Sequence, residues 1–225
     1  MNKIKKIVIN YFPYLGKVKR FVKALYFCAV KYKTYSQHGE DLAITKILKD
    51  YELSQINYID VGCNHPMDIS NTFLFYRHGA KGICIDANKE FRYLYKYFRK
   101  RDLFFPIGIG SKCEMANFHI SKTPVISGFQ NSILNERSEY VPILTLDLAC
   151  CNLDLKKITL LNIDVEGLNF EVLKGAFGIL KLTEVVCIEF DDEIERESIC
   201  KFLLEDFLLV EELSCNLLFQ RKSHL

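Results

Sequence analysis

The chain has 225 residues, 49% hydrophobic and 26% charged, which is the composition of a globular protein with enough length for one sizeable domain. Nine basic residues precede the first acidic residue, Glu40, and the rest of the chain carries 21 basic against 28 acidic residues. An acidic body with a basic N-terminal arm disfavours nucleic acid as the main ligand, and the arm suits an anionic surface.

The nine cysteines contain no C-x-x-C pair, so the sequence indicates neither a zinc site nor a disulfide framework, and we assign no metal ligand. Several lie in apolar runs such as GICID and VVCIEF, where a free thiol packs as a small hydrophobic side chain. Reduced thiols favour a cytoplasmic location. No apolar stretch near the N-terminus approaches the roughly 20 residues that span a bilayer.

Residues 1–33 alternate apolar and basic positions, and Pro13 and Gly16 predict two short helical pieces. We interpret residues 1–33 as a basic N-terminal arm and residues 34–225 as one folded domain. The arm either contacts the inner face of a membrane or a membrane-associated assembly, or it packs on the domain as a helix.

The first half of the domain alternates helical and extended patterns. Helical spacing of apolar residues predicts a helix within residues 39–49, and later helices at 72–78 and 90–100. Strands are predicted at residues 57–61, 82–86 and 103–109. The polar stretch 121–138 lacks a clear period, and we interpret it as an excursion of the chain over the site.

The second half repeats this alternation. Strands are predicted at 143–146, 160–165 and 184–190, a helix at 170–180, and a closing hairpin from strands at 207–213 and 217–220. Short β-branched runs separated by helices are typical of a parallel sheet buried on both faces. The fold class is therefore α/β, with an open, mostly parallel sheet, helices on both faces and a C-terminal antiparallel hairpin.

The first candidate site is the segment YIDVGCNHP, a strand that ends in Asp60 and Gly62. Ligands of open α/β sheets bind beyond the carboxyl ends of the strands, and a glycine there lets the backbone approach a ligand closely. The chain has neither G-x-G-x-x-G nor a P-loop, so a diphosphate is a poor fit. A ligand with an amine, a carboxylate and a sulfonium suits an acidic turn better, although an ordinary turn after a strand explains the segment equally well.

Asp86 ends the second strand, 24 positions after Gly62. A carboxylate at that position can bind both hydroxyls of a ribose, or it can cap the helix that begins near Lys89. The combination with the first loop favours the ribose.

Asp164 and Glu166 follow the strand predicted at 160–165, and extended alternation places them on one face at its carboxyl end. They could accept the proton of an attacking hydroxyl, bind an amine or coordinate a divalent cation, and Glu166 could instead cap the next helix. His65 is a candidate base because imidazole titrates near neutral pH, or its ring packs in the turn before Pro66. Glu189 is a candidate base, a metal ligand or a solvated rim charge.

Four ordered motifs resemble the FkbM family of methyltransferases over roughly residues 35–221. They are Tyr35-Ser36-Gln37-His38-Gly39-Glu40-Asp41, IDVGCNHP, Ser70-Asn71-Thr72, and IDVEG followed by Glu171-Val172-Leu173-Lys174-Gly175-Ala176. Cys63 stands where the family usually has alanine, and the basic arm lies outside the resemblance.

The resemblance implies a Rossmann-like methyltransferase fold, S-adenosylmethionine as donor and transfer of the methyl group to an oxygen. Members commonly act on sugars of bacterial surface polysaccharides or on hydroxyls of secondary metabolites. The residues expected to bind the cofactor are Gln37, Glu40, Asp60, Gly62, Asn64, Asp86 and Asn88. Asp60, Gly62 and Asn64 would line its methionine end, Asp86 would bind its ribose, and Gln37 and Glu40 would belong to a lid. The candidates for the general base are Asp164, Glu166, His65 and Glu189.

Two other functions remain open from the sequence. One is a nucleotide-dependent sugar-modifying enzyme, such as a reductase or epimerase, against which the absent phosphate loop argues. The other is a non-catalytic peripheral membrane adaptor, in which residues 1–33 bind and the α/β domain is a scaffold.

Overall fold

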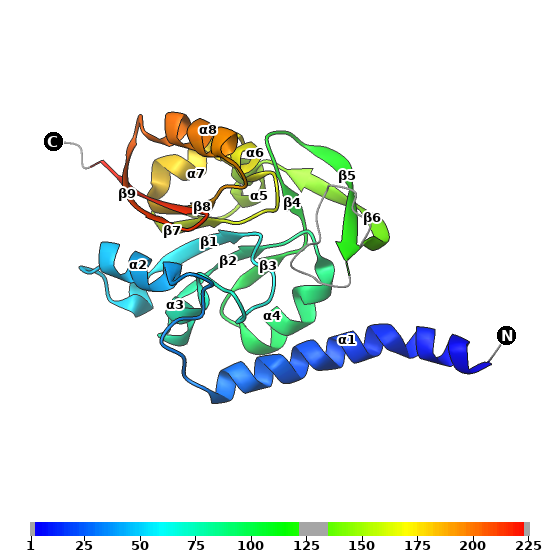
Figure 1. The fold of residues 1–225 in the computed structure, drawn as a ribbon. Helices are drawn as coiled ribbons and strands as arrows, with labels where there is room; N and C mark the ends of the chain where they lie inside the picture. Colours follow the sequence, from blue (N-terminus) through cyan, green and yellow to red (C-terminus); the bar gives the residue numbers. More distant parts are fainter. Residues whose placement is uncertain (1–2, 122–134, 223–225) are drawn as a thin grey trace.

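The computed structural model describes residues 3–121 and 135–222, and a seven-stranded sheet forms its centre (Figure 1). The strands of this sheet are β1 (Asn57–Val61), β2 (Lys81–Ile85), β3 (Leu103–Phe105), β7 (Ile158–Ile163), β8 (Thr183–Glu189), β9 (Phe207–Leu213) and β10 (Asn216–Arg221). Their order is β3-β2-β1-β7-β8-β10-β9; β10 pairs antiparallel with β8 and β9, and all other neighbouring strands are parallel. The predicted α/β fold with a closing hairpin is confirmed.

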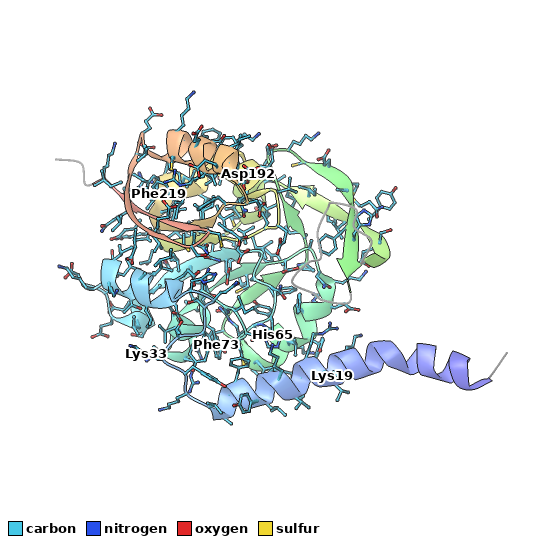
Figure 2. The ribbon with its side chains drawn as sticks, in the orientation of Figure 1. Lys19, Lys33, His65, Phe73, Asp192 and Phe219 are labelled. Carbon is cyan, nitrogen blue, oxygen red and sulfur yellow. The ribbon has the colours of Figure 1, made fainter. Side chains whose placement is uncertain are left out.

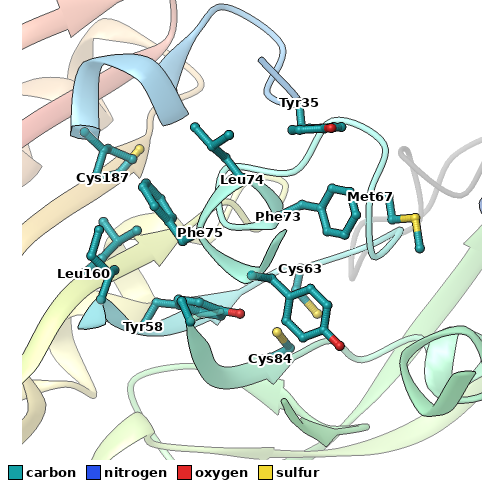
Figure 3. Close-up of a cluster of buried hydrophobic side chains, with 14 of the residues drawn as sticks. Tyr35, Tyr58, Cys63, Met67, Phe73, Leu74, Phe75, Cys84, Leu160 and Cys187 are labelled. Atoms are coloured by element: carbon teal, nitrogen blue, oxygen red, sulfur yellow. The ribbon is translucent and has the colours of Figure 1, made fainter. Parts of the chain in front are cut away.

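Helices cover both faces of this sheet. One face carries α1 (Lys3–Ala29), α2 (Glu40–Ile47), α3 (Phe73–Arg77) and α4 (Arg92–Phe98), and the other carries α5 (Leu146–Cys150), α6 (Asn169–Lys174), α7 (Phe177–Leu182) and α8 (Glu193–Leu203). Two 3-10 helices, η1 (Leu53–Gln55) and η2 (Lys89–Phe91), lie in the connections. Each face has its own apolar core, and Figure 3 shows the one beneath α1 to α4. Burial on both faces explains the continuous apolar runs of β7 and β8.

The strand predicted at 103–109 is divided between two sheets. Pro106 lies between β3 and β4 (Gly108–Ile109), and because proline has no N–H it cannot donate to the ladder of the central sheet. β4 instead joins a second sheet with β5 (Glu114–Ser121) and β6 (Asn135–Leu144), in the order β4-β6-β5. The hairpin of β5 and β6 was not predicted.

Two predictions around β6 are wrong. Residues 135–138, which we placed in the polar excursion, belong to β6, while residues 122–134 of that excursion lie outside the described residues. The strand predicted at 143–146 ends at Leu144, because Thr145 caps α5 and its Oγ1 accepts a hydrogen bond from the N–H of Leu148 at 3.2 Å.

The helix predicted at 170–180 is two helices. Gly175 separates α6 from α7, and a Cβ at this position would lie 2.2 Å from the carbonyl oxygen of Gly110. The glycine therefore lets two backbone segments touch. Helix α8 was not predicted, although Asp192 caps it by accepting a hydrogen bond from the N–H of Glu195 at 2.8 Å.

The N-terminal arm is one helix and not two pieces. α1 continues through Pro13 and Gly16, and its C-terminal half packs on the domain. Within residues 3–121 and 135–222, no helix is both long and apolar enough to cross a membrane. All nine cysteines are free thiols.

Candidate functional site

A cavity of about 320 Å³ lies beyond the carboxyl ends of β1, β2 and β7, where the strand order reverses. This is the position at which open α/β sheets bind their ligands. The cavity brings together nine of the predicted site residues: Gln37, Gly62, Asn64, His65, Asp86, Asn88, Asp164, Glu166 and Glu189. Glu40 and Asp60 lie outside its lining.

Gly62 forms the turn after β1 with a φ of 82°. A Cβ at this position would lie 1.8 Å from the carbonyl oxygen of Asp164, so no other residue fits between the ends of β1 and β7. The sequence predicted that Gly62 would let the backbone approach a ligand closely. In the structure, Gly62 lets the end of β1 approach the end of β7. This approach places Gly62 and Asp164 side by side in the wall of the cavity.

Asp86 faces the cavity at the end of β2. Its two carboxylate oxygens accept hydrogen bonds from the backbone N–H groups of Asn64, at 2.8 Å, and Asn88, at 2.7 Å. Burial raises the pKa of Asp86 to about 6 despite these hydrogen bonds. The cap of η2 is Asn88, whose Oδ1 accepts from the N–H of Glu90 at 3.0 Å, so Asp86 is not the helix cap. Each oxygen of Asp86 keeps a lone pair for a ligand.

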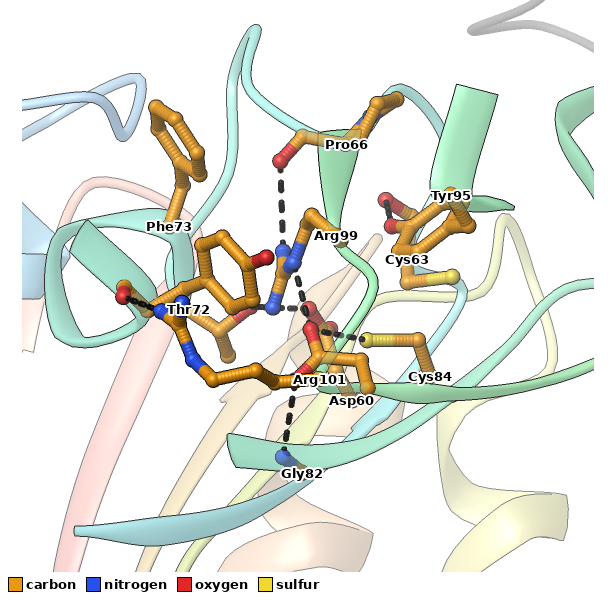
Figure 4. Close-up of polar contacts among 12 residues, drawn as sticks. Asp60, Cys63, Pro66, Thr72, Phe73, Gly82, Cys84, Tyr95, Arg99 and Arg101 are labelled. Atoms are coloured by element: carbon orange, nitrogen blue, oxygen red, sulfur yellow. Dashed lines mark hydrogen bonds and ion pairs between the residues drawn. The ribbon is translucent and has the colours of Figure 1, made fainter. Parts of the chain in front are cut away.

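Asp60 lies beneath the cavity in a buried polar network (Figure 4). Its carboxylate accepts hydrogen bonds from Thr72 Oγ1 at 2.6 Å and from Asn162 Nδ2 at 2.9 Å, and Asn71 Nδ2 donates to Asn162 Oδ1 at 3.0 Å. The network thus joins β1, β7 and the loop before α3. The structure assigns Asp60 to holding these elements together, and it does not place Asp60 at the methionine end of a cofactor.

Arg99 is the charged centre of this network, and sequence analysis missed it. Its fully buried guanidinium pairs with Asp102 at 2.6 Å and donates to Tyr58 Oη at 2.8 Å, Thr72 Oγ1 at 3.0 Å and the carbonyl of Pro66 at 3.2 Å (Figure 4). Arg99 thereby holds the loop between β1 and α3, one wall of the cavity, in place. An arginine within a helical pattern gives no sequence signal for such a position.

Gln37 and Glu40 belong to the segment that leads into α2. Gln37 lines the cavity, whereas Glu40 is buried behind it, where its carboxylate accepts from the N–H of His38 at 2.8 Å and from Asn216 Nδ2 at 3.0 Å. Glu40 therefore anchors the segment to β10, and Gln37 is the member of the pair that faces the cavity.

His65 lies over α1 and is nearly buried (Figure 2). Its Nδ1 accepts from the N–H groups of Met67, at 3.3 Å, and Asp68, at 3.1 Å, so the proton is on Nε2, which faces the carbonyl of Arg20 at 3.4 Å. Burial lowers the pKa of His65 to about 4. With both nitrogens engaged, the ring packs in the turn and the geometry disfavours His65 as a base.

Three carboxylates gather on one side of the cavity. Burial, followed by the charge of Glu189 and a side-chain hydrogen bond from it, raises the pKa of Asp164 well above its usual range. Burial and then Glu189 raise the pKa of Glu166 to about 6. β7 ends at Ile163, so the loop and not extended alternation brings Asp164 and Glu166 together.

Sequence analysis missed the apolar part of the lining. Ile107, Phe91 and Phe118 line the cavity together with Arg20 and Lys23 of α1. Phe91 lies a few residues after the end of the second strand, so its position in the sequence could have indicated that it lines the cavity. Phe118 lies in β5, which was not predicted. Within the described ranges, no cluster of three His, Cys, Asp or Glu side chains could hold a metal ion.

The comparisons with known proteins agree with this geometry. A family model described as Methyltransferase FkbM domain matches residues 60–220. A crystal structure of a candidate rRNA-methylase from Clostridium thermocellum is similar in fold, with a TM-score of 0.50 and 7% sequence identity over 84% of this chain and 99% of that chain. No curated protein matches the sequence.

Proposed function

The chain belongs to the FkbM methyltransferase domain family, and from that premise we propose that it methylates a hydroxyl oxygen of a sugar, polysaccharide or secondary metabolite, with S-adenosylmethionine as donor. The observation that carries the proposal is the cavity at the carboxyl ends of β1, β2 and β7, which has Asp86 on one side and three carboxylates on the other.

The residues of the cavity fit this donor. Asp86 has lone pairs free for two ribose hydroxyls, and Phe91, Ile107 and Phe118 offer apolar surface to a flat base. Among the described residues, no ion pair joins Asp164, Glu166 or Glu189 to a basic side chain. A cationic ligand would relieve the repulsion among these carboxylates.

The chain's part in the reaction is to align a hydroxyl and accept its proton. When bound, S-adenosylmethionine supplies a methyl group on a positively charged sulfur. The lining must hold the acceptor oxygen in line with that group, and an alcohol attacks well only as its proton leaves. Glu166 is the best placed base, because it is exposed at the cavity and its pKa of about 6 keeps it ionised at neutral pH. Burial raises the pKa of Asp164 well above its usual range, which favours its protonated form and makes it a poorer base.

A Glu166→Gln variant is expected to lower kcat by roughly 10²- to 10⁴-fold, the usual contribution of a general base. The affinity for S-adenosylmethionine should fall much less, because Asp164 and Glu189 remain beside its cationic end. The assay follows methyl-labelled donor onto a panel of sugars and nucleotide sugars, and NMR of the product identifies the methylated oxygen. Glu197→Gln, which removes an exposed carboxylate of α8, is the matched control and is expected to behave as wild type.

Full turnover by Glu166→Gln would remove this residue as the base. If the wild-type protein transferred no methyl group to any acceptor yet bound NAD, the nucleotide-dependent enzyme would be favoured. An absence of both activities would favour the adaptor.

A further inference from the structure

The face of α1 that points away from the domain carries a row of exposed apolar side chains. Val18, Val22, Leu25 and Tyr26 are 53%, 57%, 50% and 56% exposed. Because successive helical residues turn by about 100°, their spacing keeps them within one narrow band, which we call the outer stripe. Single exposed apolar residues are ordinary, but a contiguous row marks an interaction surface.

The sequence of α1 continues this spacing toward the N-terminus. Apolar residues recur there in steps of three and four, at Ile4, Ile7, Val8, Tyr11 and Leu15. With 27 residues, α1 is about 40 Å long, and Figure 1 shows its N-terminal half extending beyond the domain. The exposed apolar band is described from Val18 to Tyr26, and the sequence pattern carries the same spacing on toward the N-terminus.

Basic residues flank the outer stripe on both sides. Lys17 and Lys19 are exposed and adjacent to Val18 in sequence, so each lies about 100° around the helix from it, in opposite directions. The 39 residues before Glu40 contain nine basic and no acidic side chains. An apolar band between rows of lysine is typical of helices that lie in the plane of a membrane interface, where the long stems reach up to the headgroups.

From this arrangement we propose that α1 docks the protein on the surface of an anionic lipid bilayer. The outer stripe enters the interface, and the lysines contact the anionic headgroups. A second copy of the chain fits the outer stripe less well, because two such helices packed face to face would bring their lysines together.

The opposite face of α1 attaches the helix to the domain. Ala24 is fully buried, the ring of Phe21 lies 5.0 Å from that of Phe98, and Arg20 pairs with Glu90 at 2.9 Å. Arg20 and Lys23 also line the cavity. The helix that contacts the bilayer is thus one wall of the cavity, so docking fixes the orientation of the cavity relative to the membrane.

Vesicle flotation of the full chain tests this proposal without reference to catalysis. We expect binding to vesicles of phosphatidylcholine with phosphatidylglycerol, little binding to phosphatidylcholine alone, and weaker binding as salt is added. The double variant Val22→Glu with Leu25→Glu is expected to lose binding by at least about tenfold, since two apolar side chains would no longer be buried and two negative charges are added.

Ile194→Glu with Leu208→Glu, which adds the same charges at exposed apolar positions of α8 and β9, is the matched control and is expected to bind as wild type. Unchanged melting temperatures would show that both variants fold. Equal binding by the α1 variant and the wild type would overturn the proposal. So would a dimer, seen by light scattering, that the α1 variant abolishes while vesicle binding is absent.

Discussion

An Asp86→Ala variant is expected to bind S-adenosylmethionine at least about 100-fold more weakly than the wild-type protein. Asp86 faces the cavity with lone pairs free for both ribose hydroxyls. Hydrogen bonds to a charged group contribute about 1.5–3 kcal/mol each, and the loss of two therefore exceeds two powers of ten in Kd. Isothermal titration calorimetry measures this change directly.

Asp50→Ala is the matched control for Asp86→Ala. Asp50 is an exposed carboxylate in the turn after α2 and does not line the cavity, so its removal should leave the Kd unchanged. Melting of both variants without ligand reports whether they fold, because Asp86 also accepts two backbone N–H groups. Wild-type affinity in a folded Asp86→Ala variant would refute the assignment of this carboxylate to the ribose.

The same carboxylate predicts how cofactor affinity depends on pH. Burial raises the pKa of Asp86 to about 6, and the ionised form is the better acceptor for ribose hydroxyls. Affinity should therefore be constant above about pH 7 and decline as the pH falls through 6. Because the pKa of Glu166 is also about 6, the measurement is repeated in a Glu166→Gln variant, which lacks that group. If Asp86 causes the loss of affinity at low pH, the loss should persist in this variant. A flat profile there would contradict the role of Asp86.

Replacing Arg99 by methionine is expected to lower the free energy of unfolding by about 3–5 kcal/mol, the usual cost of removing one partner from a buried ion pair. Arg99 and Asp102 are both fully buried, and without the guanidinium the side-chain carboxylate keeps only neutral donors, namely Tyr58 Oη, the N–H of Gly82 and the thiol of Cys84. Urea denaturation of the two proteins gives the difference.

The double variant Arg99→Met with Asp102→Asn tests whether the pair itself explains that loss. We expect it to regain part of the stability, because it removes both buried charges. Arg99 also binds the carbonyl of Pro66 and Thr72, so the single variant should loosen the cavity wall and weaken cofactor binding. A single variant within about 1 kcal/mol of the wild type would show that the network does not support the fold.

The central strands could be predicted because burial on both faces leaves runs of apolar residues. β1 matches its predicted range, and every residue of β7 is buried. The hairpin of β5 and β6 was not predicted because apolar residues in it are exposed: Met115 is 60% and Tyr140 is 74% exposed. The positions of its apolar residues therefore do not indicate which side of the hairpin is buried. The continuity of α1 was not predicted, because proline and glycine weaken a helix without always ending it.

The location of the site could be predicted more fully than the role of each residue. The sequence places Asp86, Asp164 and Glu189 at or just after the ends of predicted strands, and because the carboxyl ends of parallel strands meet at one edge of the sheet, all three line the cavity there. Asp60 lies one residue before the end of β1, and its side chain enters the network of Thr72 and Asn162. Sequence spacing does not show which of two nearby carboxylates faces a ligand and which faces the core.

A crystal structure of the protein with S-adenosylmethionine tests the central claim most directly. We expect the ligand in the cavity beyond β1, β2 and β7, with both ribose hydroxyls on Asp86 and its cationic end toward Asp164 and Glu166. Density for the ligand elsewhere, or a cavity that side chains fill while the ligand stays unbound, would contradict the account.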